Sequence, residues 1–375
     1  MQDERGLGYL LAVAGAAVWT PRPLVAMLDA LGNARALIDY ARDASRFPPL
    51  ACEHLGVEAL GRIAAIDDEA ARCALVNARE GEQRVVTSTD ENYPARLRLL
   101  CDPPPVLYYR GTLESLEGRV VAIVGSRGAT PYGRAMARAI VSDFAEFSAT
   151  VISGLARGID AAAHRAANEA DVPTVAVIGS GLLALYPNYH AVLANEIVDK
   201  GGAIISEFPP KMAARTHHFP MRNRLVAALA DATVVVEAGS KSGALITARL
   251  AGDLGRPVFA VPGDVGRTTS EGTNALIKDG VALTTGAADI AGVLSWGTRR
   301  RHAQTNSRDS MASNDLASRL LAALAPGGSD VDEVCAATGL DTATVSAQLT
   351  LLEMRGIVER RAGGLFCAQL ERSLR

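Results

Sequence analysis

Short apolar runs, rich in β-branched residues, alternate with longer helical patterns through the middle of the chain. The runs cover residues 120–124, 150–152, 174–178, 203–205, 233–236 and 258–261. Near-continuous apolar strands separated by helices are typical of a parallel sheet that helices cover on both faces. The pattern therefore predicts an α/β domain with a doubly wound, Rossmann-like parallel sheet over residues 90–296.

The segment before this domain has a helical pattern instead. Residues 1–85 are rich in alanine and leucine, with breaks at Gly6, Gly32 and residues 47–49. We expect a small all-α N-terminal domain of the SAM or helix-hairpin-helix type. Residues 93–111 contain a run of three prolines, which favours an extended connector into the α/β domain.

The segment after the α/β domain predicts a third unit. Residues 297–314 are polar without an apolar period, which indicates a linker before a domain at residues 315–375. Three helices followed by a short hairpin are typical of a winged helix. Its third helix carries few basic side chains, whereas a helix that recognises duplex DNA usually presents more of them. Contact with another protein or weak binding to duplex DNA is therefore at least as well supported as sequence recognition of duplex DNA. A domain that only stabilises the fold is a further alternative. The expected helices are 316–324, 330–338 and 341–355, and the expected hairpin strands are 357–361 and 364–367.

Composition narrows the function classes. The 375 residues carry a formal net charge of −3, so any nucleic-acid binding would need a local basic pocket. The five cysteines are widely spaced and form no CxxC pair, which suggests neither a disulfide framework nor a zinc site and fits the cytoplasm. The apolar stretch at residues 9–19 is too short to span a membrane. We expect a cytoplasmic protein with no membrane segment.

The loops that follow the predicted strands hold the candidate chemistry, because ligands of open parallel sheets bind beyond the carboxyl ends of the strands. The first strand leads to a glycine–serine–arginine loop, and Thr130 and Pro131 are suited to begin the next helix. Backbone N–H groups at such a helix start favour anions. An ordinary strand–helix turn is the alternative. The candidate residues in the first three loops are Gly125, Ser126, Arg127, Gly154, Arg157 and Gly181.

The next two loops add further basic and stacking groups. Arginines beside an asparagine at a helix start suit phosphates or base edges, and a nearby aromatic ring can stack on a base. A Gly/Ser/Lys loop follows the fifth strand but lacks the spacing of a P-loop. These loops converge on one edge of the sheet, so we expect a phosphate-binding pocket. The candidates here are Phe219, Arg222, Asn223, Arg224, Lys241, Ser242 and Gly243.

Two other site chemistries are weighed against phosphate binding. The histidines near the loops have no metal-ligand spacing, so no metal is expected, and a glycine motif at residues 179–184 does not support a nicotinamide cofactor. Glu207 and Glu237 could be the acid and base of a nucleotide hydrolase. Glu207 is equally well explained by bonding to the arginines at residues 222–224. A transcription factor with a ligand-sensing α/β core is a third alternative.

The ordered motifs resemble the DNA-processing protein A (DprA/Smf) family over about residues 90–285. The resemblance implies no enzymatic activity and no cofactor. It implies a homodimer that binds single-stranded DNA, protects incoming DNA and loads the RecA recombinase during natural transformation. It also implies that residues 125–127 hold phosphates and that Phe219 and residues 222–224 line the same pocket. The motifs are residues 124–127, 153–160, 186–187, 219–224, 242–247 and 262–263.

Overall fold

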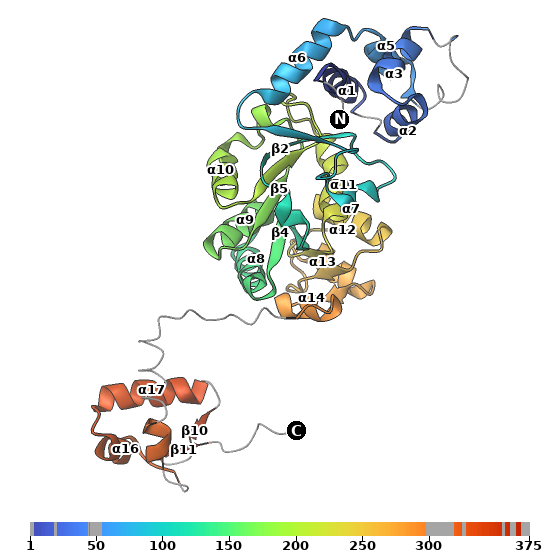
Figure 1. Ribbon diagram of the computed structural model, residues 1–375. Coiled ribbons are helices and arrows are strands. Elements are labelled where there is room, and N and C mark those ends of the chain that lie inside the picture. The colour runs from blue at the N-terminus through green and yellow to red at the C-terminus, as the bar shows by residue number, and fades with distance from the viewer. Residues whose placement is uncertain are drawn as a thin grey trace. The chain divides into compact units, whose positions relative to one another are not determined.

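The computed structural model describes residues 4–18, 21–43, 45, 55–297, 319–324, 328–354, 357–360 and 365–368 (Figure 1). The chain divides into two compact units, Met1–Arg300 and Arg301–Arg375. In the described residues, no helix is both long and apolar enough to cross a membrane.

The first unit is built on a mostly parallel sheet with the strand order β1-β2-β6-β5-β4-β3-β7-β8-β9. All six predicted strands form, and each pairs in parallel with its neighbours among them. The extended segment predicted over residues 93–111 is not only a connector, because its last part forms β2, which pairs antiparallel with β1 and β6. The strands are β1 (Arg84–Thr87), β2 (Val106–Gly111), β3 (Arg119–Val124), β4 (Ala149–Ser153), β5 (Thr174–Val177), β6 (Ala203–Ser206), β7 (Ala232–Val235), β8 (Val258–Ala260) and β9 (Ala282–Leu283).

The winding direction of the sheet reverses between β3 and β7. From β3 the chain proceeds through β4 and β5 to β6 on one side, and then returns to place β7 against the other side of β3. In open α/β sheets the crevice at such a reversal, beyond the carboxyl ends of the strands, is where ligands bind. The loops after β3 and β7 are therefore the first place to look for a site.

Helices cover both faces of the sheet, as the continuous apolar strands require. Successive side chains of β3 point to opposite faces. Val121 and Ile123 join the core under α8 and α9, whereas Val120 and Ala122 join the core under α11 and α12. The helices around the sheet are α7 (Ala95–Arg98), α8 (Pro131–Asp143), α9 (Ile159–Glu169), α10 (Ala191–Asp199), α11 (His218–Leu229), α12 (Gly243–Asp253), α13 (Glu271–Lys278) and α14 (Ala287–Val293).

The predicted N-terminal helices form and share a core with the sheet. Leu11 and Ile63 belong to the same buried cluster as Tyr108 of β2 and Leu193 of α10. The expected break at Gly6 was wrong, since this residue lies within the first turn of α1. The expected break at residue 32 is confirmed, since this glycine follows the end of α2 and has a positive φ of 81°. The expected break at residues 47–49 lies outside the described part of the chain. The helices are α1 (Glu4–Ala16), α2 (Pro21–Leu31), α3 (Ala34–Arg42), α5 (Val57–Ala64) and α6 (Asp68–Arg79).

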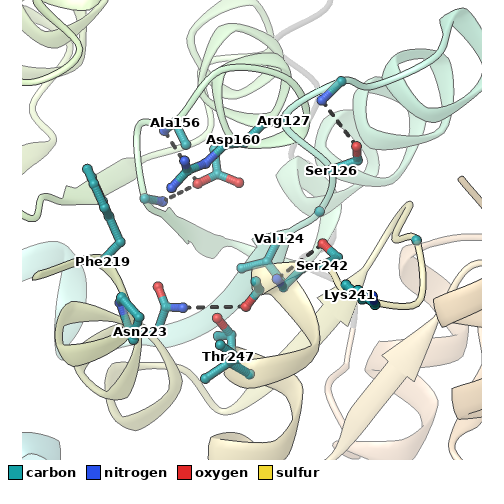
Figure 2. A pocket seen from close by; sticks show the side chains of 18 of the residues that line it. Val124, Ser126, Arg127, Ala156, Asp160, Phe219, Asn223, Lys241, Ser242 and Thr247 are labelled. Atoms are coloured by element: carbon teal, nitrogen blue, oxygen red, sulfur yellow. Dashed lines mark hydrogen bonds between the residues drawn. The ribbon is translucent and has the colours of Figure 1, made fainter. Parts of the chain in front are cut away.

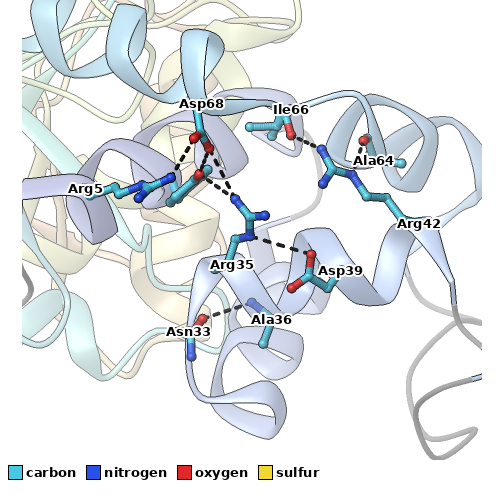
Figure 3. Close-up of polar contacts among 10 residues, drawn as sticks. Arg5, Asn33, Arg35, Ala36, Asp39, Arg42, Ala64, Ile66 and Asp68 are labelled. Carbon is cyan, nitrogen blue, oxygen red and sulfur yellow. Dashed lines mark hydrogen bonds and ion pairs between the residues drawn. The ribbon is translucent and has the colours of Figure 1, made fainter.

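Polar contacts connect the N-terminal helices to one another (Figure 3). Asp68 at the start of α6 accepts hydrogen bonds from Tyr9 and Arg5 of α1, the latter at 2.6 Å. Arg35 of α3 donates to the same carboxylate at 3.3 Å. Arg42 at the end of α3 donates to the backbone carbonyls of Ala64, the last residue of α5, and of Ile66 after it. The contacts of Asp68 thus connect α1, α3 and α6 around one carboxylate.

The second unit has the predicted winged-helix pattern. Residues 319–324 include a helical turn, and α16 (Val331–Thr338) and α17 (Thr342–Met354) follow. Asp330 and Glu333 form a capping box at the start of α16. Strands β10 (Val358–Arg360) and β11 (Phe366–Ala368) pair antiparallel as the hairpin. Its buried core consists of Leu320, Val334, Val345, Leu349, Leu352, Val358 and Phe366.

Candidate nucleic-acid pocket

A pocket of about 860 Å³ opens beyond the carboxyl ends of β3 and β7, at the point where the winding reverses. Figure 2 shows side chains of the β3 loop, of α11 and of the loop before α12 around it. Many of the predicted site residues are brought together here. Those that line the pocket are Gly125, Ser126, Arg127, Gly154, Phe219, Arg222, Asn223, Lys241, Ser242 and Gly243.

The start of α8 is held as predicted but is bound by a carboxylate of the protein itself. Thr130 caps α8 by accepting a hydrogen bond from Gly133 N at 3.1 Å. The N–H of Thr130 donates to Oε2 of Glu237 at 2.8 Å. A Cβ at position 133 would lie 2.4 Å from the same oxygen, so only glycine leaves room for it. The positive end of the α8 dipole therefore faces Glu237 rather than a free ligand site.

The loop between β4 and α9 is also filled by a carboxylate of the protein. Asp160 accepts hydrogen bonds from the backbone N–H groups of Gly154 and Ala156, at 3.1 and 3.4 Å. Burial raises the pKa of Asp160, while the nearby charge of Arg222 acts in the opposite direction. Two of the backbone N–H groups of this loop, those of Gly154 and Ala156, are thus occupied by Asp160.

Arg222 lies in the wall of the pocket and only 4% of it is exposed. Its Nη1 donates to the carbonyl of Val177. A Cβ at Gly154 would lie 2.0 Å from the same nitrogen, so the loop can pass over the guanidinium only with a glycine there. Burial lowers the pKa of Arg222 to about 10, and it stays charged at neutral pH. Arg222 therefore contributes positive charge from beneath the pocket surface.

Two other cations, Arg127 and Lys241, lie on the surface of the pocket. Among the described residues, neither Arg127 nor Lys241 forms an ion pair with a carboxylate, and both are exposed. The guanidinium of Arg127 lies over the ring of Phe219, 4.9 Å from its centroid. The Phe219 ring is in turn 5.7 Å from the ring of Tyr186. Ser126 completes this surface, with its hydroxyl oxygen accepting from Gly128 N at 3.1 Å.

Three predicted site residues do not line the pocket. Arg224 is buried in an ion pair with Glu207, at 2.6 Å, and a second one with Asp102, at 2.9 Å. Arg157 lies outside the pocket and donates to the backbone carbonyl of Arg127 at 3.0 Å. A Cβ at Gly181 would lie 2.1 Å from the carbonyl oxygen of Pro209, so this glycine serves backbone packing.

The pocket also has lining residues that the sequence prediction does not include. Tyr186 belongs to a Tyr-Pro motif, and Thr247 follows Gly243 by one helical turn, so motif and helical spacing could have indicated both. The loop after β8 contains the motif at residues 262–263, but Thr268 and Glu271 beyond it carry no comparable signal, because only the fold brings them to this edge. The added residues with polar or aromatic side chains are Asp160, Tyr186, Thr216, Ser240, Thr247, Thr268 and Glu271.

The histidines near the site have internal partners. His164 shares a hydrogen bond with Thr174, and His218 shares one with the carbonyl of Gly179, at 2.7 and 2.9 Å. Within the described residues, no group of three or more His, Cys, Asp or Glu side chains could hold a metal ion.

Comparisons with known proteins agree with this architecture. A family profile described as DNA recombination-mediator protein A matches residues 84–295, and one described as the DprA winged helix domain matches residues 304–364. Protein Smf of Escherichia coli is 38% identical over 284 residues, which cover 75% of this chain and 76% of that protein.

Two solved structures share both fold and sequence with the chain. The structure of DNA processing protein A from Streptococcus pneumoniae has a TM-score of 0.65 and 30% identity, and the match covers 78% of this chain and 99% of that one. A structure described as giving insight into the single-stranded DNA binding mode of DNA processing protein A from Helicobacter pylori has a TM-score of 0.52 and 30% identity, covering 58% of this chain and 99% of that one. The chain therefore belongs to the DNA-processing protein A (DprA/Smf) family.

Proposed function

We propose that the chain binds single-stranded DNA in the pocket beyond β3 and β7. The observation that carries this proposal is one pocket that holds two exposed cations and an aromatic ring. Arg127 and Lys241 form no ion pair among the described residues, and the Arg127 guanidinium lies over the ring of Phe219. Basic groups that follow the backbone, combined with rings that stack on bases, are the usual means of binding single strands without sequence preference. Buried Arg222 adds positive charge from below.

The similarity to the Helicobacter pylori relative supports the same ligand. From the family resemblance we further propose that the protein acts in the cytoplasm as a homodimer. In this role it protects incoming single-stranded DNA and loads the RecA recombinase onto it during natural transformation. Light scattering would measure the dimer, and the rate of RecA filament assembly on single-stranded DNA would measure loading.

The geometry does not favour a nucleotide hydrolase that uses Glu207 and Glu237. Glu207 is buried and bonded to Arg224, and Glu237 is bonded to the N–H of Thr130. Neither carboxylate lines the pocket. An acid or base must lie within hydrogen-bond reach of the proton it transfers. These two residues therefore support the fold rather than a reaction in the pocket.

Fluorescence anisotropy with labelled single- and double-stranded oligonucleotides, at several salt concentrations, tests DNA binding. We expect tight single-strand binding, weaker duplex binding, and a log–log salt slope of about −0.7 for each phosphate contacted. If neither form binds at low salt, the pocket is not a nucleic-acid site. Turnover of a nucleoside monophosphate that is lost in Glu237→Gln would support the hydrolase instead.

A further inference from the structure

The segment between β5 and the first turn of α10 exposes four large apolar side chains, one of which, Tyr186, lines the pocket. Leu183, Tyr186, Tyr189 and Val192 are 41%, 52%, 64% and 69% exposed. Large apolar groups that gather on one surface segment usually mark a binding surface. Two of these four are tyrosines, whose rings offer flat faces for stacking.

The backbone of this segment is held firmly in place. The N–H of Gly181 donates to the carbonyl of Met212 at 2.8 Å, and the N–H of Leu183 donates to that of Pro210 at 2.9 Å. At the other end, Nδ1 of His190 shares a hydrogen bond with the carbonyl of Leu155 at 2.8 Å. The exposed tyrosine rings thus extend from a backbone that hydrogen bonds hold at both ends of the segment.

The tyrosines continue the stacking groups of the pocket. The guanidinium of Arg127 lies over Phe219, whose ring is 5.7 Å from that of Tyr186 at an angle of 51°. Tyr186 itself lines the pocket. Tyr189, three residues on, packs edge-on against His190 with 4.7 Å between ring centroids. Phe219 and Tyr186 thus form a pair of rings at the pocket, and Tyr189 adds a second exposed ring three residues further along the β5–α10 segment.

We propose that Tyr186 and Tyr189 form a stacking platform for the bases of the bound strand where it leaves the pocket. This inference rests on the proposed function, because the strand held at Arg127 is the ligand that continues onto the platform. Rings that stack on successive bases accept any sequence, since every base has a π-face. The direct contact of Tyr186 with Phe219 favours this strand over a separate protein partner.

Anisotropy with two oligodeoxythymidines, one confined to the pocket and one several nucleotides longer, tests the platform. Tyr186→Ala should weaken binding of both about tenfold, the loss of one stacked base. Tyr189→Ala should weaken only the longer one. Tyr186→Phe, which keeps the ring, should bind as the wild type does, and Val192→Ala is the matched control for an exposed apolar side chain that cannot stack.

A second readout reports stacking directly. A strand that carries 2-aminopurine just outside the pocket should lose fluorescence on binding to the wild type and to Tyr186→Phe, and less so on binding to Tyr186→Ala. If Tyr186→Ala leaves both the affinity and the quenching unchanged, the proposed platform is wrong. If Arg127→Ala weakens DNA binding in the same assay, the proposed function still holds.

Three other outcomes would also overturn the platform. An equal loss for Val192→Ala would indicate an apolar docking surface without stacking. Altered self-association of Tyr189→Ala with normal DNA binding would identify the segment as a protein interface. Absence of wild-type binding to both oligonucleotides would remove the proposed function together with the platform.

Discussion

The guanidinium of Arg127 is accessible, lies on an aromatic ring and has no carboxylate partner among the described residues. Arg127→Ala should therefore weaken single-strand binding for all sequences alike and make the salt slope shallower by about 0.7, the contribution of one phosphate. Anisotropy titrations over a range of salt concentrations measure both effects.

Arg249→Ala is a suitable control for Arg127→Ala. This side chain is 85% exposed on α12, outside the pocket, and lies 3.8 Å from Asp253. Its loss removes the same formal charge from the molecule and should leave the salt slope unchanged. If Arg127→Ala keeps wild-type affinity and slope, Arg127 is not a phosphate contact.

Arg224 should behave differently, because it neutralises a buried carboxylate. Arg224→Ala leaves Glu207 buried without its partner, and removal of one member of such a pair costs about 3–5 kcal/mol of stability. Urea unfolding would measure this loss. The folded fraction should still bind DNA as the wild type does, since Arg224 does not line the pocket.

A double variant separates these explanations for Arg224. Replacing both charges, as Arg224→Met with Glu207→Leu, should recover part of the lost stability because no uncompensated charge remains buried. Weakened DNA binding in a stably folded Arg224 variant would show that the residue reaches the strand after all.

The arginine–asparagine–arginine motif shows how far residue types predict a site. Residue types alone placed Arg222, Asn223 and Arg224 in one pocket, yet Arg224 points elsewhere. Each helical residue turns about 100° from the last, so two positions apart means nearly opposite faces. Helical spacing could have separated Arg222 from Arg224. It could not show that Gly154 passes directly over Arg222, because that contact joins distant segments.

At the scale of elements, the start of α8 depends on Glu237. The carboxylate accepts from Thr130 N and lies in the space left by Gly133. Glu237→Gln keeps the shape but loses the charge at the positive end of the helix, so stability should fall by about 1 kcal/mol. Chemical denaturation would measure this, with Thr130→Ser as a control that retains the cap.

The same variant bears on the hydrolase alternative. Because Glu237 has a structural partner, the nucleotide turnover of Glu237→Gln should equal that of the wild type. The affinity of the variant for DNA should also stay near that of the wild type. If Glu237→Gln is as stable as the wild type but loses nucleotide turnover, Glu237 has a role in catalysis rather than a structural role.

Strand prediction succeeded where the pattern was strongest. The six apolar runs all became parallel strands because both of their faces are buried. Three strands were missed. Strand β1 is only four residues long and begins at the end of the segment predicted to be all-helical, β2 directly follows the proline run and pairs antiparallel, and β9 has only two residues, both exposed. The predicted doubly wound sheet is confirmed, but the position of its reversal, between β3 and β7, was not predicted, because strand order is set by pairing between distant segments.

At the scale of the whole molecule, the N-terminal helices and the sheet depend on each other. Tyr9 and Leu37 from the helices share a buried cluster with Tyr108 and Leu182 from the α/β part. Separating the two parts would expose this apolar surface to water, at about 25 cal/mol for each Å². The first unit should therefore unfold as one cooperative body, although its sequence pattern changes near residue 85.

Two truncations test this dependence against the division near residue 300. Removal of residues 1–83 should lower the melting temperature of the α/β part strongly or cause aggregation, because the cluster around Tyr108 and Leu182 loses its cover. Removal of residues 301–375 takes away a unit with its own core and should leave the main melting transition and single-strand affinity unchanged. Differential scanning calorimetry and anisotropy measure the two effects. A stable, DNA-binding fragment that lacks residues 1–83 would show that the shared cluster is dispensable. A loss of single-strand affinity on removing residues 301–375 would mean that the pocket beyond β3 and β7 is not the whole binding surface.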